Sequence, residues 1–123
     1  MNTTLITGAS SGIGEAFARK LAARGRNVLL VARSEDKLNA LCNELGRLTS
    51  IRAQYVALDL QQPDAAAQLF EETKKRELEI EMLINNAGFG SMGDFVKLDL
   101  NRELEIIQLN IRSLVDVTHR FLQ

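Results

Sequence analysis

Three glycines near the start of the sequence are the residues best suited to chemistry. Gly8, Gly12 and Gly14 follow a short β-branched and apolar run, Thr3 to Thr7, and open a segment rich in alanine and leucine. Glycine lets a phosphate approach the backbone closely, and the free N–H groups at the start of a helix point at such an anion. The partial positive charge of the helix N-terminus favours the same ligand. We therefore predict that this loop binds a nucleotide phosphate.

The spacing of these glycines is G-x-x-x-G-x-G. It differs from the G-x-G-x-x-G fingerprint of many dinucleotide sites, and no Gly-Lys-Ser/Thr follows that would make a P-loop. Three glycines also suit a flexible turn between a strand and a helix. The interpretation therefore depends on a second signal elsewhere in the chain.

That second signal follows the next expected strand, Asn27–Val31. In dinucleotide folds, an acidic residue roughly 20 positions after the glycine loop binds the ribose of adenosine. Here the strand is followed by Ala32, Arg33 and Ser34, with no carboxylate at its tip. A guanidinium binds a 2′-phosphate through charged hydrogen bonds, whereas a carboxylate repels it. Arg33 thus favours NADP over NAD, and a solvated surface arginine is the alternative interpretation.

Two further polar stretches fit a dinucleotide site. Asp59 and Leu60 end the third expected strand, where a carboxylate and a backbone amide can reach an adenine ring; a turn or cap role explains Asp59 equally well. Asn85 and Asn86 can hold neighbouring loops through side-chain bonds, with Gly88 allowing close approach of a cofactor. A plain asparagine-glycine turn is the alternative for that stretch.

Asn110 is a polar residue on an otherwise apolar helical stripe that includes Ile106 and Leu114. An amide buried on such a stripe needs hydrogen-bond partners. A structural bond to a backbone carbonyl and a role in catalysis explain this residue equally well.

The elements that position these residues alternate along the chain without interruption. The expected strands are Thr3–Thr7, Asn27–Val31, Ile51–Leu58 and Glu81–Ile84, and the expected helices are Gly12–Gly25, Ser34–Leu48, Pro63–Leu78 and a long one from about Asn101 to the end. This alternation predicts an α/β fold, a Rossmann-type doubly wound parallel sheet forming one domain over residues 1–123. The expected strand order is 3-2-1-4, which brings the ends of strands 1 and 4 to one crevice where ligands bind.

Composition limits the class of protein. Of the 123 residues, 46% are apolar and 25% charged, which is typical of one soluble domain. A net charge of −1 gives no basic surface for nucleic acid or an anionic membrane. The single cysteine, Cys42, excludes an internal disulfide and a multi-cysteine metal site, so we expect no metal. No apolar run is long enough to span a membrane, and the first strand begins at once, so we expect a cytoplasmic protein without a signal peptide.

Taken together, these motifs resemble those of the short-chain dehydrogenases/reductases. The resemblance rests on Thr7-Gly8-Ala9-Ser10-Ser11-Gly12-Ile13-Gly14, Asp59-Leu60, Asn85-Asn86-Ala87-Gly88 and Asn110-Ile111, in that family's order and spacing across the whole chain. It implies a dinucleotide cofactor, with its adenine flanked by Asp59 and Leu60. A ribose of this cofactor would pass beside Asn86, Ala87 and Gly88. Its pyrophosphate and ribose would be lined by the residues of the glycine loop, namely Gly8, Ser10, Ser11, Gly12, Ile13 and Gly14.

The resemblance also assigns roles to three single residues. Ala32 stands where members that prefer NAD carry an aspartate, and Arg33 stands where members that prefer NADP carry a basic residue. Asn110 would belong to the catalytic set, holding a water that connects to a lysine. We therefore expect NADPH to be preferred over NADH.

The sequence departs from this family in its catalytic residues. Family members use a serine and a Tyr-x-x-x-Lys, in which the lysine lowers the pKa of the tyrosine. Tyr55 is the single tyrosine, Asp59 stands four residues after it, and no Ser-Tyr-Lys set can be assembled. We expect the NADP(H)-binding part of an oxidoreductase that moves hydride between nicotinamide and a carbonyl or alcohol substrate, inactive by itself. A non-catalytic nucleotide-binding or dimerisation module is the alternative.

The last expected helix is apolar over a wide arc. One line of the helix carries Leu100, Leu104, Ile107, Ile111 and Leu114, and Ile106, Leu109 and Val117 lie beside it. A helix this apolar buries more than one face, and the fourth strand has an unpaired outer edge. We therefore expect self-association through this helix or that strand edge.

Phe89 and Met92, in the loop after the fourth strand, are the residues expected to contact a substrate.

Overall fold

The structure, a computed structural model, describes residues 2–123. Its strands are β1 (Asn2–Thr7), β2 (Val28–Ala32), β3 (Ala53–Ala57) and β4 (Glu79–Ile84), and its α-helices are α1 (Gly12–Ala23), α2 (Glu35–Leu48), α3 (Ala65–Lys75), α4 (Leu100–Ile107) and α5 (Leu114–Phe121). A 3₁₀ turn, η1 (Phe95–Lys97), precedes α4, and a π-helical segment, η2 (Gln108–Ser113), joins α4 to α5. The predicted alternation of strands and helices is confirmed, with boundaries close to those expected.

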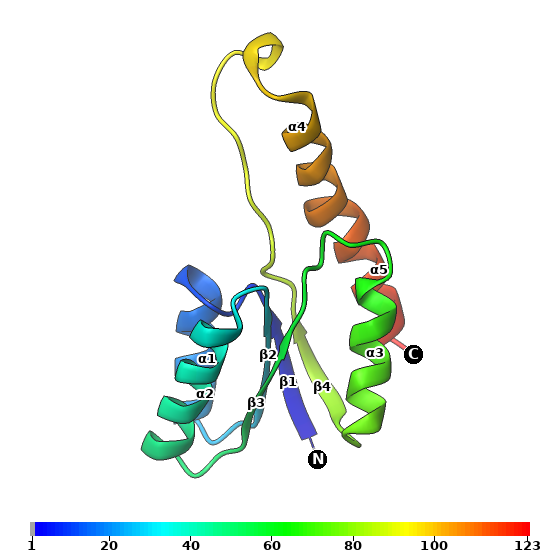
Figure 1. Cartoon of the computed structure of the whole chain (residues 1–123). Helices are drawn as coiled ribbons and strands as arrows, with labels where there is room; N and C mark the ends of the chain where they lie inside the picture. The colour runs from blue at the N-terminus through cyan, green and yellow to red at the C-terminus, as the bar shows by residue number, and fades with distance from the viewer. Residues whose placement is uncertain (1) are drawn as a thin grey trace.

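All four strands form one parallel sheet in the order β3-β2-β1-β4, which confirms the predicted order. Thr7 of β1 lies opposite Val31 of β2, and Ile6 lies opposite Ile84 of β4. The carboxyl ends of these three strands are therefore level with one another. Helices α1 and α2 cover one face of the sheet and α3 and α5 the other (Figure 1), the doubly wound arrangement.

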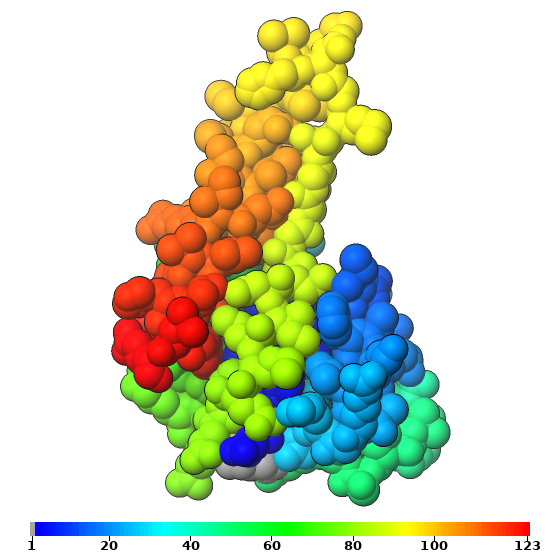
Figure 2. Space-filling view, turned by 180° about the vertical axis from the view of Figure 1, so that it is seen from behind, coloured from blue at the N-terminus to red at the C-terminus, as the bar shows by residue number. Residues whose placement is uncertain are grey.

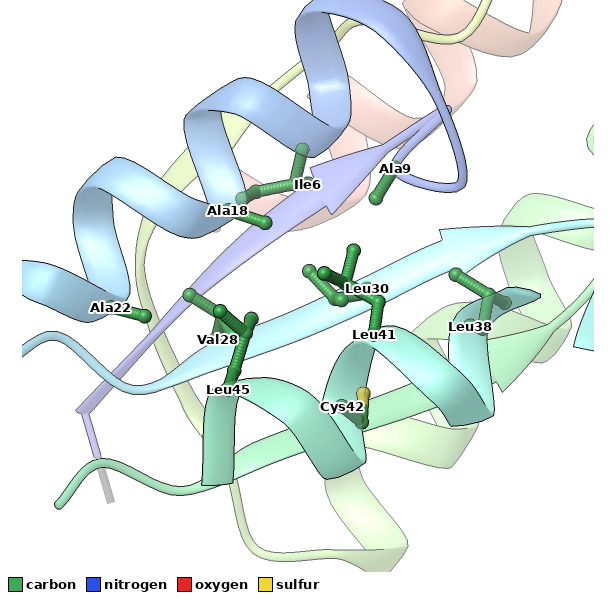
Figure 3. Close-up of a cluster of buried hydrophobic side chains, with 10 residues drawn as sticks. All are labelled: Ile6, Ala9, Ala18, Ala22, Val28, Leu30, Leu38, Leu41, Cys42 and Leu45. Atoms are coloured by element: carbon green, nitrogen blue, oxygen red, sulfur yellow. The ribbon is translucent and has the colours of Figure 1, made fainter. Parts of the chain in front are cut away.

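Successive residues of the central strands pack into two separate cores. Ile6 and Leu30 face α1 and α2, where Figure 3 shows them among the other buried apolar side chains. Their neighbours Leu5 and Leu29 face the opposite layer, which contains α3 and α5. Burial of a strand on both faces explains why its sequence is continuously apolar rather than alternating. The two cores fix the sheet and leave its carboxyl edge to the loops.

The segment from the end of β4 to η2 projects beyond that edge as an arm, seen from the front in Figure 1 and from behind in Figure 2. The sequence predicts one continuous helix from about Asn101, and this is wrong in detail, because η2 interrupts it. The apolar stripe of Leu100, Leu104, Ile107, Ile111 and Leu114 lies on the surface, with side chains between 39% and 66% exposed. Within residues 2–123, no helix combines the length and the apolar character needed to cross a bilayer.

Cys42 provides a test of the core beneath α2, in which its side chain is only 8% exposed (Figure 3). Burial raises the pKa of the Cys42 thiol from 9.0 to about 11. The folded state thus favours the protonated thiol. Its contribution to the free energy of unfolding is fully present below the pKa of the unfolded state, 9.0, and is lost as the pH rises through the pKa of the folded state, about 11. Between pH 9 and 11, we expect the free energy of unfolding to fall by roughly 2 kcal/mol more than that of the Cys42→Ala variant. Urea unfolding over this pH range measures the difference, and parallel curves would contradict it.

Candidate functional site

A cavity of about 980 Å³ opens at the carboxyl ends of the strands. Its lining includes ten of the residues that the sequence analysis assigned to the site: Gly8, Ser10, Ser11, Ile13, Arg33, Asp59, Leu60, Asn86, Ala87 and Gly88. Three others, Gly12, Gly14 and Asn110, lie outside the lining. The segments after all four strands therefore meet at one hollow, which is the place where ligands bind in sheets of this kind.

The glycine loop brings the start of α1 to this cavity. Gly8 and Gly12 have φ values of +63° and +57°, which a residue with a side chain rarely adopts. Ser11 caps α1 in an extended conformation, and its side chain makes no hydrogen bond to the helix. The first N–H groups of a helix lack intrahelical partners, so those of α1 are left for an anion. Because Ser11 and Ile13 line the cavity, these groups lie at its wall.

Gly14 has a packing role rather than a place in the lining. A Cβ atom built on it would lie 2.5 Å from Nδ2 of Asn86 and closer still to the carbonyl oxygen of Gly8. A side chain at this position would therefore collide with the protein's own loops. The glycine allows the first turn of α1 to pack directly against the segments that follow β1 and β4.

Hydrogen bonds tie the ends of β1 and β4 together. Oγ1 of Thr7 accepts bonds from the backbone N–H groups of Asn86 and Ala87, at 3.0 and 2.9 Å. Nδ2 of Asn86 donates to the carbonyl oxygen of Gly8 at 3.1 Å. Asn85 points elsewhere and donates from Nδ2 to Oγ1 of Thr118 at 2.8 Å. Asn86 thus holds a neighbouring loop, as one of the two interpretations of this stretch expects.

Asn110 brackets the backbone of Phe89. Its Oδ1 accepts from the N–H of Phe89 at 3.1 Å, and its Nδ2 donates to the carbonyl oxygen of the same residue at 2.8 Å. A Cβ on Gly88 would lie only 2.9 Å from Oδ1 of Asn110, so glycine is needed for this approach. The structural bond considered for Asn110 is therefore present, and it joins Asn110 to a residue of the lining. A catalytic role for this residue remains a prediction.

The lining carries more positive than negative charge. Arg33, Lys37 and Arg102 contribute cationic groups, and Asp59 contributes the one carboxylate of the lining. Within residues 2–123, neither Arg33 nor Lys37 has an ion-pair partner. Oδ1 of Asp59 accepts from the backbone N–H of Gln61 at 3.0 Å, which is the turn role considered for it. The cavity is therefore suited to a ligand with several negative charges.

Lys37 and Arg102 were missed by sequence reasoning. Lys37 stands four residues after Arg33, in the first turn of α2, and a second cation so close in sequence was a usable signal. Arg102 had no such signal, because it reaches the cavity only when α4 folds back over the loop. Its guanidinium lies 3.9 Å from the centre of the Phe89 ring. Of the two residues expected to contact a substrate, Phe89 lines the cavity, whereas Met92 is 95% exposed and lies outside the lining.

Comparison with known proteins shows to which family the chain belongs. The sequence profile of the short chain dehydrogenase family matches residues 2–123. A 7beta-hydroxysteroid dehydrogenase from Collinsella aerofaciens is 31% identical over 119 residues, which cover 97% of this chain and 44% of that protein. The chain therefore belongs to the short-chain dehydrogenase/reductase family.

Solved structures agree with this assignment. A short-chain dehydrogenase from Sphingobium yanoikuyae in complex with NADPH is 34% identical, with a TM-score of 0.90, and the match covers 98% of this chain and 47% of that one. An alcohol dehydrogenase from the archaeon Thermococcus sibiricus, complexed with 5-hydroxy-NADP, is 31% identical with a TM-score of 0.93, covering 99% and 52%. The chain spans about half the length of the relatives it matches.

The packing role of Gly14 leads to a stability prediction. We expect Gly14→Ala to lower the free energy of unfolding by about 1–3 kcal/mol, because the new Cβ forces apart the loops after β1 and β4. Gly46→Ala is the matched control, since Gly46 lies in α2 with no heavy atom within 4 Å of an added Cβ. The control should gain about 0.5–1 kcal/mol, the usual benefit of alanine over glycine in a helix. Urea unfolding compares them, and equal stability of the two variants would refute the role given to Gly14.

Proposed function

We propose that residues 1–123 are the NADP(H)-binding domain of a short-chain oxidoreductase. In the whole protein, the bound nicotinamide would exchange hydride with a carbonyl or alcohol carbon of a small-molecule substrate. The observation that carries this proposal is the cavity between the glycine loop and the segment after β4, with Arg33 and Lys37 at its side. A helix N-terminus and two unpaired cations are the groups that a ligand with a pyrophosphate and a further phosphate requires.

The proposed roles of the site residues follow from the segments to which they belong, whether or not each residue lies in the lining. Gly8 to Gly14 would hold the pyrophosphate and its ribose, Asp59 and Leu60 would flank the adenine, and Asn86 to Gly88 would pass beside a ribose. Arg33 would bind the 2′-phosphate, and Lys37, in the first turn of α2, adds a second positive charge to the same cavity. The NADPH and 5-hydroxy-NADP bound to the two solved relatives support a phosphorylated cofactor.

Hydride transfer to a carbonyl also needs a proton donor, and we propose that these 123 residues do not supply it. The phenol of Tyr55 donates a hydrogen bond to Oε1 of Glu35 at 3.3 Å and is no part of the cavity lining. Oδ1 and Nδ2 of Asn110 are bonded to Phe89. The domain therefore binds cofactor without appreciable turnover by itself.

A cytoplasmic location belongs to the same proposal, because a lone buried thiol such as Cys42 suits a reducing compartment.

Cofactor selectivity is the sharpest test of this proposal. We expect Arg33→Ala to weaken NADPH binding by about 1–3 kcal/mol, because a charged hydrogen bond to the 2′-phosphate is removed, and to leave NADH binding almost unchanged. Titration of each variant with both cofactors, followed by cofactor fluorescence, measures the two affinities.

Arg47→Ala is the control for this titration, since Arg47 lies in the last turn of α2, at the opposite end from Arg33. It should leave both affinities as they are. Equal losses of NADPH and NADH affinity in Arg33→Ala would exclude the phosphate contact, and absence of binding by the unaltered chain would exclude the cofactor-binding function itself.

We further propose that the chain self-associates through the exposed apolar stripe that runs from α4 through η2 to the start of α5, and that the partner is a second copy of the chain. Leu104, Ile107 and Ile111 are each more than half exposed although they share one face of the arm. A two-fold pairing would place this stripe against its own copy, so that each chain covers the other. β4 is an edge strand of the sheet and offers a second route to the same association.

Sedimentation velocity tests the association. At tens of micromolar we expect the unaltered chain to sediment as a dimer and Leu104→Glu as a monomer, because a carboxylate in the centre of the stripe would be buried without a partner. Leu48→Glu is the matched control, as Leu48 is 66% exposed at the end of α2, away from the stripe. A monomeric unaltered chain, or loss of the dimer in the control, would contradict this assignment.

A further inference from the structure

Ser113 is a buried hydroxyl at the end of η2 that no motif of the sequence singled out. Its side chain is 6% exposed, and its Oγ donates a hydrogen bond to the carbonyl oxygen of Leu60. Leu60 lines the cavity in the segment that follows β3. One bond therefore joins the helical arm to a wall of the cavity, between residues 53 positions apart in the chain.

The other bonds of this wall are local or lead to β2. The N–H of Leu58 donates to the carbonyl oxygen of Ala32 at 2.8 Å. Asp59 accepts from Gln61 at 3.0 Å and, through its carbonyl oxygen, from Gln62 at 3.1 Å. These bonds shape the turn and tie it to Ala32 of β2, which also lines the cavity. The bond from Ser113 adds a second tie, to the helical segment η2 in a different layer of the fold.

The opposite wall is held by the same helical segment. Asn110 brackets the backbone of Phe89, which also lines the cavity, and Leu109 of η2 belongs to the lining as well. A π-helical turn contains an extra residue relative to an α-helix and is frequent at functional sites. Through Ser113 and Asn110, η2 thus contacts the segments after both β3 and β4.

We propose that Ser113 is a positioning residue for the cofactor cavity. By holding the carbonyl of Leu60, it keeps the Asp59–Gln61 wall at the spacing from Phe89 that admits the adenosine part of the cofactor. This inference rests on the proposed function, and it assigns Ser113 an effect on affinity without contact with the ligand. Because NADPH and NADH share their adenosine, both affinities should depend on Ser113 equally, in contrast to their unequal dependence on Arg33.

The first experiment compares cofactor affinities. We expect Ser113→Ala to bind NADPH and NADH about three- to tenfold more weakly, the usual effect of one lost hydrogen bond, with the ratio of the two affinities unchanged. Thr73→Ala is the matched control, because Thr73 is also buried and its hydroxyl donates to the carbonyl oxygen of Phe70 at 2.7 Å, away from the cavity lining. This control should lose stability and keep both affinities. Unchanged affinities in Ser113→Ala, or an equal loss in Thr73→Ala, would overturn the proposal.

The second experiment needs no cofactor and separates this inference from the proposed function. In the ligand-free Ser113→Ala variant, hydrogen exchange at the amides of Gln61 and Gln62 should be about three- to tenfold faster than in the unaltered chain. In Thr73→Ala, exchange at these two amides should be unchanged. If the unaltered chain bound neither cofactor, the proposed function would fail while exchange still decided whether Ser113 positions the wall. Unaltered exchange at these two amides would refute the positioning role.

Discussion

The hydroxyl of Thr7 and the amide of Asn86 join two segments that are almost eighty residues apart in the chain. Thr7 receives two backbone N–H groups from the segment after β4, and Asn86 returns a bond to the loop after β1. These bonds convert two adjacent strand ends into the floor of one cavity. Without them, the parallel pairing of β1 and β4 would still form, but the glycine loop and the asparagine segment would be free to separate.

Topology was the part of this protein most readily predicted from sequence. The continuous apolar runs around Leu5 and Leu29 indicated strands buried on both faces, and the alternation with amphipathic helices left few possible sheet orders. These patterns are repeated over many residues, so an error at one position does not change the result. The strand order and the convergence of four segments at one edge follow from them directly.

Individual roles were harder to predict, because they depend on contacts rather than on patterns. The spacing of the glycines predicted Gly14 as part of the ligand site, which stays a prediction, and only its neighbours show that it also allows close packing with Gly8 and Asn86. The break in the last helix could not be predicted, and the π-helical segment there carries side-chain bonds from Asn110 and Ser113 to distant backbone groups. Helical periodicity identifies an apolar stripe but gives no information about such hydrogen-bond partners.

The tight fit around Gly14 has a consequence for the energetics of binding. Because the first turn of α1 leaves no space for even a methyl group at Gly14, the two ends of the loop proposed to bind phosphate, Gly8 and Gly14, are held together by the fold itself. A flexible glycine loop would lose conformational entropy on closing around a phosphate, and that loss would weaken affinity. Here the packing at Gly8 and Gly14 is established during folding, so under the proposed function the phosphate would not have to supply the free energy for bringing these two ends together.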